Sequence, residues 1–300
     1  MPFNLTGKGM YLWQIKRVLG GDPARIAQAC VDAGLTHVWI KVADGIQEYN
    51  KWGIVNGREY YNLQSGEDLV PPLIAALRDR GISPWGWQYI YGTYPDREAL
   101  LAYERCKSLG VDGFVINAEK EFERDNTSAK MDWDKQQRAA QTYSASLYLN
   151  MGGDMPIGFS SFRYPTAHPL PYPAFLGVCN FNAPQVYWIG SNNPEAQLDR
   201  SLKEYRAIRD IPQFPTGAAY GQVTADQIRR FMQASKDRGL AGCNFWEMKY
   251  AIDSHDYWST ISQFDYGTVV YPPTPQQSLQ EQIDDLRADV RIIKDMLGLA

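Results

Sequence analysis

One short unit recurs along the chain: a helix-like segment, a glycine, and then a strand-like apolar run. The glycines are Gly34, Gly81, Gly110 and Gly239. A glycine that follows a helix commonly adopts the left-handed conformation that ends it. Each unit therefore predicts a helix that turns straight into a strand, and this alternation is typical of α/β folds built around a parallel sheet.

Eight segments have the apolar character expected of buried parallel strands. They are residues 10–15, 37–41, 84–89, 112–121, 157–163, 183–188, 215–220 and 242–247. Eight strand–helix units in about 265 residues match the size of one (β/α)8 barrel. An open doubly wound sheet is the main alternative, but no Gly-x-Gly-x-x-Gly turn follows the first strand. We therefore predict an α/β fold, a TIM barrel spanning residues 1–268.

The end of the chain has a different pattern. Residues 269–277 form a proline-rich linker, and residues 278–300 place apolar side chains alternately three and four positions apart. This spacing is the heptad pattern of a coiled coil. We expect residues 278–300 to form a C-terminal coiled-coil helix that makes the protein a homo-oligomer. The alternative is a single amphipathic helix packed back on the barrel.

Charge and residue usage exclude several classes of partner. The net charge is -4, so there is no basic surface of the kind that selects nucleic acid or an anionic membrane. The three histidines and four cysteines are scattered without metal-ligand spacing. No apolar run is long enough to span a bilayer. We expect no nucleic-acid partner, no membrane segment, no metal and no cofactor.

The segment 112–121 reads as a buried strand that ends in acids. Alternation of side chains between the two faces places Phe114 and Ile116 on an apolar face, and Asn117 and Glu119 together on the other. The carboxyl ends of the strands are where (β/α)8 barrels carry their catalytic residues. Glu119 is therefore the leading catalytic candidate, and a strand that runs out into a solvated loop is the simpler alternative.

The inward face of each predicted strand can be projected onto the same end of the barrel. This projection gives two groups of candidates. The catalytic group is Glu119, Asn117, Glu121 and Tyr187. The substrate-binding group is Trp13, Trp39, Lys41, Asp44, Gln185 and Trp246. A lysine inside a barrel needs a carboxylate or a ligand as partner, and we expect Glu119 to be the partner of Lys41.

The strand of residues 112–119, Asp-Gly-Phe-Val-Ile-Asn-Ala-Glu, resembles the Asp-Gly-x-Asp-x-Asp-x-Glu motif of family 18 chitinases. It departs from that motif at Val115 and Asn117. The remaining Asn-x-Glu is similar to the pair of family 85 endo-β-N-acetylglucosaminidases. That resemblance implies that Asn117 orients the N-acetyl group of the substrate and that Glu119 is the general acid/base. The chitinase resemblance further implies a tyrosine, Tyr187, near that group and a tryptophan floor, Trp246.

A second resemblance is to family 25 lysozymes. Residues 41–45, Lys-Val-Ala-Asp-Gly, and residues 117–119, Asn-Ala-Glu, look like the second and fourth strands of that family. Both resemblances cover two or three strands, and together they imply a glycosidase-like barrel.

Our leading hypothesis is a glycoside hydrolase that cleaves an N-acetylhexosamine-containing polysaccharide such as peptidoglycan or a chitin-like chain. Glycosidic cleavage needs an acid and a nucleophile or base, and substrate-assisted enzymes use the sugar's own acetamide. If the strand continues, Glu119 and Glu121 could instead act as an inverting acid and base pair. The alternative from another class is a noncatalytic saccharide-binding or structural barrel, displayed as an oligomer.

The amino-terminal segment has no apolar core of signal-peptide length. We therefore expect cytoplasmic synthesis. A cell-wall hydrolase made in the cytoplasm must be released by lysis or carried on a particle, which fits a phage origin; an enzyme of intracellular glycan turnover fits as well.

Overall fold

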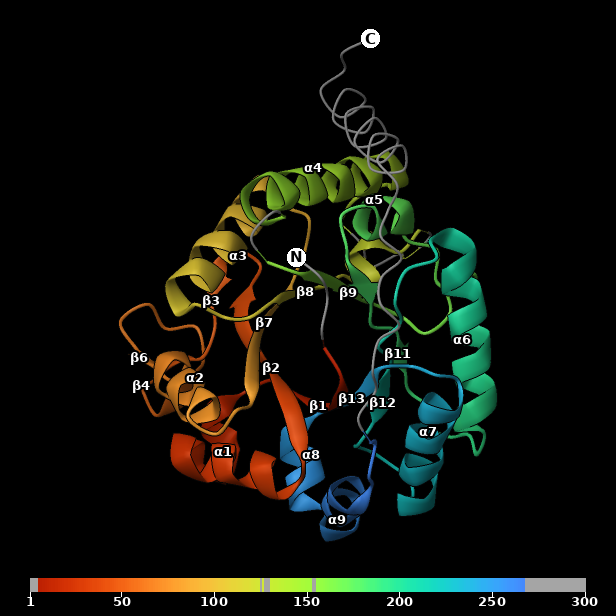
Figure 1. Ribbon diagram of the computed structural model, residues 1–300. Coiled ribbons are helices and arrows are strands. Elements are labelled where there is room, and N and C mark those ends of the chain that lie inside the picture. The colour runs from red at the N-terminus through yellow and green to blue at the C-terminus, as the bar shows by residue number, and fades with distance from the viewer. Residues whose placement is uncertain (1–4, 125, 127–129, 153–154, 268–300) are drawn as a thin grey trace, which may run out of the picture.

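The computed structural model describes residues 5–124, 126, 130–152 and 155–267. Parallel strands form the inside of a barrel, and helices surround them (Figure 1). The barrel strands are β1 (Gly7–Leu12), β2 (Leu35–Asp44), β7 (Ser83–Tyr89), β8 (Phe114–Asn117), β9 (Ile157–Ser160), β10 (Phe181–Asn182), β11 (Gln185–Val186), β12 (Thr216–Ala218) and β13 (Gly242–Trp246). The predicted TIM barrel is therefore confirmed.

The helices follow the strands in the alternating order expected of this fold. They are α1 (Pro23–Asp32), α2 (Val70–Arg78), α3 (Pro95–Leu109), α4 (Trp133–Met151), α5 (Tyr172–Leu176), α6 (Pro194–Ile208), α7 (Ala225–Asp237), α8 (Met248–Asp253) and α9 (His255–Gln263). Short 3-10 turns are η1 (Ile15–Arg17), η2 (Leu19–Gly21) and η3 (Lys120–Phe122). Among the described residues, no helix is long and apolar enough to cross a membrane.

The barrel closes at its sixth strand, which is interrupted at residues 183–184. Proline has no backbone N–H to donate to a neighbouring strand, and Pro184 separates β10 from β11. The first half, β10, pairs with β9, and the second half, β11, pairs with β12. Backbone hydrogen bonds continue on both sides of the break, because Ala183 donates to Phe159 at 2.7 Å and Thr216 donates to Pro184 at 2.9 Å.

The predicted strand limits differ from the observed ones by up to four residues. The first strand runs from Gly7 to Leu12, three residues earlier than expected, and the fourth ends at Asn117, four residues before its predicted end. All four glycines of the repeated unit have φ angles between 61 and 72°, as the helix-ending role requires. Helix α7 begins with a capping box: the Thr224 side chain accepts from the Gln227 backbone N–H, and the Gln227 side chain accepts from the Thr224 backbone N–H.

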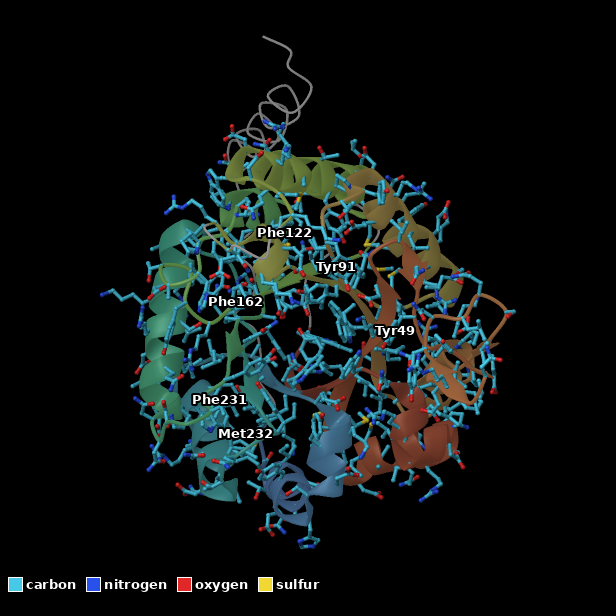
Figure 2. The ribbon with its side chains drawn as sticks, turned by 180° about the vertical axis from the view of Figure 1, so that it is seen from behind. Tyr49, Tyr91, Phe122, Phe162, Phe231 and Met232 are labelled. Atoms are coloured by element: carbon cyan, nitrogen blue, oxygen red, sulfur yellow. The ribbon has the colours of Figure 1, made fainter. Side chains whose placement is uncertain are left out.

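Two apolar layers separate along the strands as their alternation requires. Phe114 and Ile116 belong to the core between the strands and the helices, as predicted, and Val115 belongs to the barrel interior. Figure 2 shows side chains filling both layers, with Phe231 and Met232 on α7 in the outer one. The interior holds the rings of Tyr11, Trp39, Trp85, Trp87, Phe181 and Phe214.

The connection after β2 carries a small antiparallel sheet, and this sheet flanks one side of the barrel (Figure 1). Its strands are β4 (Lys51–Val55), β5 (Arg58–Tyr60) and β6 (Glu67–Asp68), and β3 (Gln47–Glu48) pairs with β2. Arg105 of α3 lies 2.7 Å from Asp68 and 3.6 Å from Glu48, which ties the insertion to the barrel. The predicted linker and coiled-coil helix, residues 269–300, lie outside the described residues.

Candidate active site

Glu119 lies just beyond the carboxyl end of β8, and two amide side chains hold its carboxyl group. Asn117 Nδ2 donates to Glu119 Oε1 at 3.0 Å, and Gln185 Nε2 donates to the same oxygen at 2.8 Å. Asn117 is buried, whereas Glu119 and Gln185 are partly exposed. The structure therefore brings together three of the predicted site residues, from β8 and β11. The other oxygen, Oε2, has no hydrogen-bond partner among the described residues and is available to a ligand.

Tyrosine side chains surround Glu119. Burial raises the pKa of the Tyr89, Tyr187 and Tyr220 hydroxyls, and the nearby charge of Glu119 raises each of them further. Tyr187 packs edge-on against Tyr220, with ring centroids 5.5 Å apart. These hydroxyls therefore stay protonated at neutral pH. Tyr89 donates a hydrogen bond to Glu121 Oε2, whereas Tyr187 and Tyr220 can act as hydrogen-bond donors beside the carboxyl group of Glu119. Tyr187 was predicted, whereas the strand pattern did not single out Tyr89 and Tyr220.

Lys41 lies inside the barrel as predicted, but its ion-pair partner is Asp44. Lys41 Nζ is 3.2 Å from Asp44 Oδ1, and it also lies over the rings of Tyr49 and Trp87, at 4.4 and 5.1 Å from their centroids. The predicted direct pairing with Glu119 was wrong. Residues three apart on a regular strand point to opposite faces. The pairing of β2 with β7 shifts register between Lys41 and Ala43, and this irregularity allows the Asp44 side chain to reach Lys41. Burial lowers the pKa of Lys41, and Asp44 partly opposes that effect.

Tryptophans form the floor on the other side of the mouth. Trp246 packs edge-on against Trp87 at 5.6 Å and lies 6.3 Å from Trp13, measured between ring centroids. Both Trp13 and Trp246 are partly exposed. Aromatic rings in such positions suit stacking against the apolar faces of sugars. In Figure 2, Tyr49 and Tyr91 also lie around the centre of the barrel.

The assignment of Trp39 to the substrate site was wrong. Trp39 is fully buried and packs against Tyr11, Phe181 and Phe214 in the barrel interior. Its inward direction was predicted correctly. However, Trp39 stands two residues before Lys41 on β2 and belongs to a deeper layer, where side chains fill the barrel and no ligand reaches.

The expected continuation of the fourth strand to Glu121 was also wrong. The strand ends at Asn117, and residues 120–122 form the 3-10 turn η3. Glu121 instead accepts a hydrogen bond from the Tyr89 hydroxyl at 2.5 Å. The regular two-residue spacing that would pair Glu121 with Glu119 is therefore lost.

A second buried carboxyl group lies at the end of β13. Glu247 follows Trp246 and is only 2% exposed. Burial raises its pKa to about 7, against hydrogen bonds from the backbone N–H groups of Trp13 and Lys249 that lower it. Glu247 lies at the end of the last predicted strand, but it was not among the predicted site residues. The available signal was the same one that selected Glu119, an acid at the carboxyl end of a barrel strand.

The described part of the chain contains no group of three His, Cys, Asp or Glu side chains arranged to hold a metal ion. The polar side chains at the mouth are the carboxyl groups of Glu119 and Glu247, the tyrosine hydroxyls, the amides of Asn117 and Gln185 and the ammonium group of Lys41.

Comparison with solved structures identifies the fold. A family 18 chitinase from Pseudoalteromonas aurantia has a TM-score of 0.60, at 11% sequence identity, over 86% of this chain and 99% of the other. The barrel folds like a family 18 chitinase. A chitinase from Rhizomucor miehei has a TM-score of 0.59 at 11% identity, over 85% of this chain and 98% of the other.

The chitinase-like fold is shared with other glycosidases. An endo-1,4-β-mannanase from Rhizomucor miehei has a TM-score of 0.60 at 12% identity, over 86% of this chain and 93% of the other. No family model matches the sequence, and no curated protein matches it significantly. At these identities the likeness establishes the architecture, and the side chains at the mouth carry the functional argument.

Proposed function

We propose that the protein is a glycoside hydrolase that cleaves an N-acetylhexosamine-containing polysaccharide, with Glu119 as the general acid/base. The observation that carries this proposal is the double hydrogen bond from Asn117 and Gln185 to one oxygen of Glu119. The two amides orient the carboxyl group at the carboxyl end of the barrel strands and leave its second oxygen for the glycosidic bond. The solved structures with the same fold include chitinases and a mannanase, which supports the same class of reaction.

We favour the substrate-assisted version of the reaction. Glu119 gives its proton to the leaving oxygen as the glycosidic bond breaks, and the acetamide oxygen of the substrate attacks the anomeric carbon to form a cyclic intermediate. Water then attacks the same carbon, Glu119 takes the proton from that water, and the acetamide is released. Each hydrolysis therefore consumes one water and returns Glu119 to its protonated state.

The positions of the other residues support this version over a two-carboxylate reaction. Asn117 lies beside Glu119 and is placed to orient the acetamide, Tyr187 offers a protonated hydroxyl, and Trp246 offers a ring beneath the sugar. Glu121 is bound to the Tyr89 hydroxyl on a separate turn. It therefore lacks the strand position from which it would act as the partner base.

The test is Glu119→Gln, measured as release of new reducing ends from chitin oligomers and from peptidoglycan. Loss of a general acid lowers the rate by on the order of 10²–10⁴-fold. Glu121→Gln is the matched control, because it removes a carboxyl group two residues further along the chain that is bound to the Tyr89 hydroxyl, and it should retain most of the activity. Circular dichroism checks that both variants fold. Full activity of Glu119→Gln would move the role to another residue, and binding without any cleavage by the unaltered protein would favour a noncatalytic saccharide-binding barrel.

A further inference from the structure

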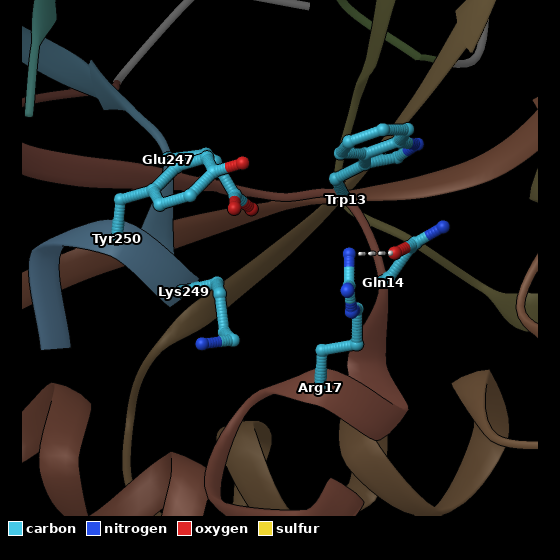
Figure 3. A pocket seen from close by; sticks show the side chains of 6 residues that line it. All are labelled: Trp13, Gln14, Arg17, Glu247, Lys249 and Tyr250. Atoms are coloured by element: carbon cyan, nitrogen blue, oxygen red, sulfur yellow. Dashed lines mark hydrogen bonds between the residues drawn. The ribbon is translucent and has the colours of Figure 1, made fainter. Parts of the chain in front are cut away.

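A small pocket lies at the β1 and β13 side of the barrel mouth, between η1 and α8 (Figure 3). Its volume is about 100 Å³. The lining residues are Trp13, Gln14, Arg17, Glu247, Lys249 and Tyr250. Pockets that enclose whole small-molecule ligands usually measure about 300 Å³ or more. This pocket therefore suits one substituent of a sugar and is too small for a complete ring.

Glu247 offers an unpaired oxygen to this pocket. Backbone N–H groups of Trp13 and Lys249 hydrogen-bond the carboxyl group. Its Oε2 atom, in contrast, is buried and has no hydrogen-bond partner among the described residues. Figure 3 shows the carboxyl group directed into the space between Trp13, Arg17 and Lys249. Buried polar atoms in folded proteins normally have partners, so this oxygen marks a place where a ligand atom completes the structure.

The two cationic side chains of the pocket differ in whether they already have an anionic partner. Lys249 already forms an ion pair with Asp253 on α8. Arg17 is exposed, and among the described residues it has no ion pair; its Nη1 donates only to Gln14 Oε1, at 3.3 Å. Arginine binds carboxylates with two parallel hydrogen bonds. Arg17 can therefore receive an anionic group that enters the pocket.

Trp13 connects the pocket to the proposed catalytic mouth. Its ring lies 6.3 Å from that of Trp246, centroid to centroid, and it also lines the pocket. A saccharide that stacks on Trp246 can therefore direct a substituent past Trp13 towards Arg17 and Glu247. This connection makes the pocket part of the same binding surface as Glu119.

We propose that this pocket is a subsite for the carboxylate of an acidic sugar residue, bound by Arg17 and by the carboxyl group of Glu247. The proposal rests on the proposed function, and it specifies the substrate as an N-acetylhexosamine chain that carries carboxylate substituents. A neutral chain offers Arg17 no anionic group to bind in addition to Gln14.

The subsite has a defined pH dependence. The groups that face Glu247 are Arg17 from η1, Lys249 from α8 with its partner Asp253, and the hydroxyl of Tyr250. Below pH 7 the carboxyl group of Glu247 is protonated and donates a hydrogen bond to the ligand carboxylate. Above pH 7 it is ionised and repels that carboxylate, so binding of the acidic sugar weakens as the pH rises.

The test is isothermal titration calorimetry on the full chain carrying Glu119→Gln, which separates binding from cleavage. The two probes are β-1,4-linked N-acetylglucosamine tetrasaccharides, one neutral and one with lactyl carboxylates on alternate sugars. At pH 6 we expect the acidic probe to bind about 10-fold more tightly, as one charge-assisted contact provides. That preference should shrink at pH 8. Adding Arg17→Gln should remove the preference, and adding Glu247→Gln should remove its pH dependence.

The matched control is Arg25→Gln, which removes an exposed arginine of α1 outside the pocket and should keep the preference. Equal affinity for the two probes, or the same loss with Arg25→Gln as with Arg17→Gln, would overturn the subsite. The two proposals can fail separately. A protein that cleaves polysaccharide but does not prefer the acidic probe retains the proposed function without the subsite. A protein that prefers the acidic probe but cleaves nothing retains the subsite without the enzyme.

Discussion

Asn117 Nδ2 lies 3.0 Å from Oε1 of Glu119, although Asn117 still belongs to β8 and Glu119 lies two residues beyond it. Asn117 is the last residue of β8, and Glu119 belongs to the connection that follows. The Asn117 amide therefore orients the carboxyl group of Glu119, whose backbone is no longer part of the strand. A side chain in this position can orient Glu119 and a bound acetamide at once.

Replacing Asn117 separates these two roles. We expect Asn117→Ala to lower kcat on N-acetylated oligomers by about 10–100-fold, the loss expected for one preorganised polar contact to the transition state. Gln185→Ala is the comparison, because Gln185 contacts the same oxygen of Glu119 from β11. If Asn117 serves only Glu119, the two variants should lose activity equally. An additional role towards the acetamide predicts a larger loss for Asn117→Ala.

The ion pair of Lys41 and Asp44 predicts an asymmetric effect on stability. Removing the carboxylate leaves the buried ammonium group uncompensated, so we expect Asp44→Asn to lower the free energy of unfolding by about 1–3 kcal/mol. Lys41→Met removes the buried charge and keeps apolar contacts with Tyr49 and Trp87, so it should change stability by less than about 1 kcal/mol. Urea unfolding measures both. A larger cost for Lys41→Met would contradict this account.

Glu247 predicts a dependence of stability on pH. Its folded-state pKa of about 7 is above its usual value of 4.5. Between these values the folded chain holds more protons than the unfolded chain, so stability falls as the pH rises and levels off above pH 7. One pKa unit corresponds to about 1.4 kcal/mol, which sets the contribution at about 3 kcal/mol. Urea unfolding from pH 4 to pH 8 should show this fall in the unaltered protein and its absence in Glu247→Gln.

The proposed coiled-coil helix predicts a change in assembly. Deleting residues 276–300 should reduce the molar mass measured by light scattering to that of a single chain and leave the barrel folded. The physical reason is that an isolated heptad helix of this length is stable only when its apolar stripe is covered. An unchanged mass would show that these residues do not hold an oligomer together.

The sequence by itself determined the barrel architecture and which side chains of each strand point into the barrel. Glycines such as Gly110 end helices through a local backbone conformation, and alternation along strands such as β8 places Asn117 on the face opposite Ile116. Both effects depend on near neighbours in the chain. This is why the barrel and the Asn117–Glu119 pair were predictable.

Only the tertiary structure decided how far along the barrel each side chain lies and which side chains meet across it. Gln185 reaches Glu119 from 66 positions away, Trp39 lies one layer too deep for a ligand, and Lys41 takes Asp44 as its partner. Glu247 acquires its raised pKa from burial beneath the segment around Trp13. Strand register, the end of β8 and the break at Pro184 set these depths and contacts, and such long-range geometry leaves no periodic signal in the sequence.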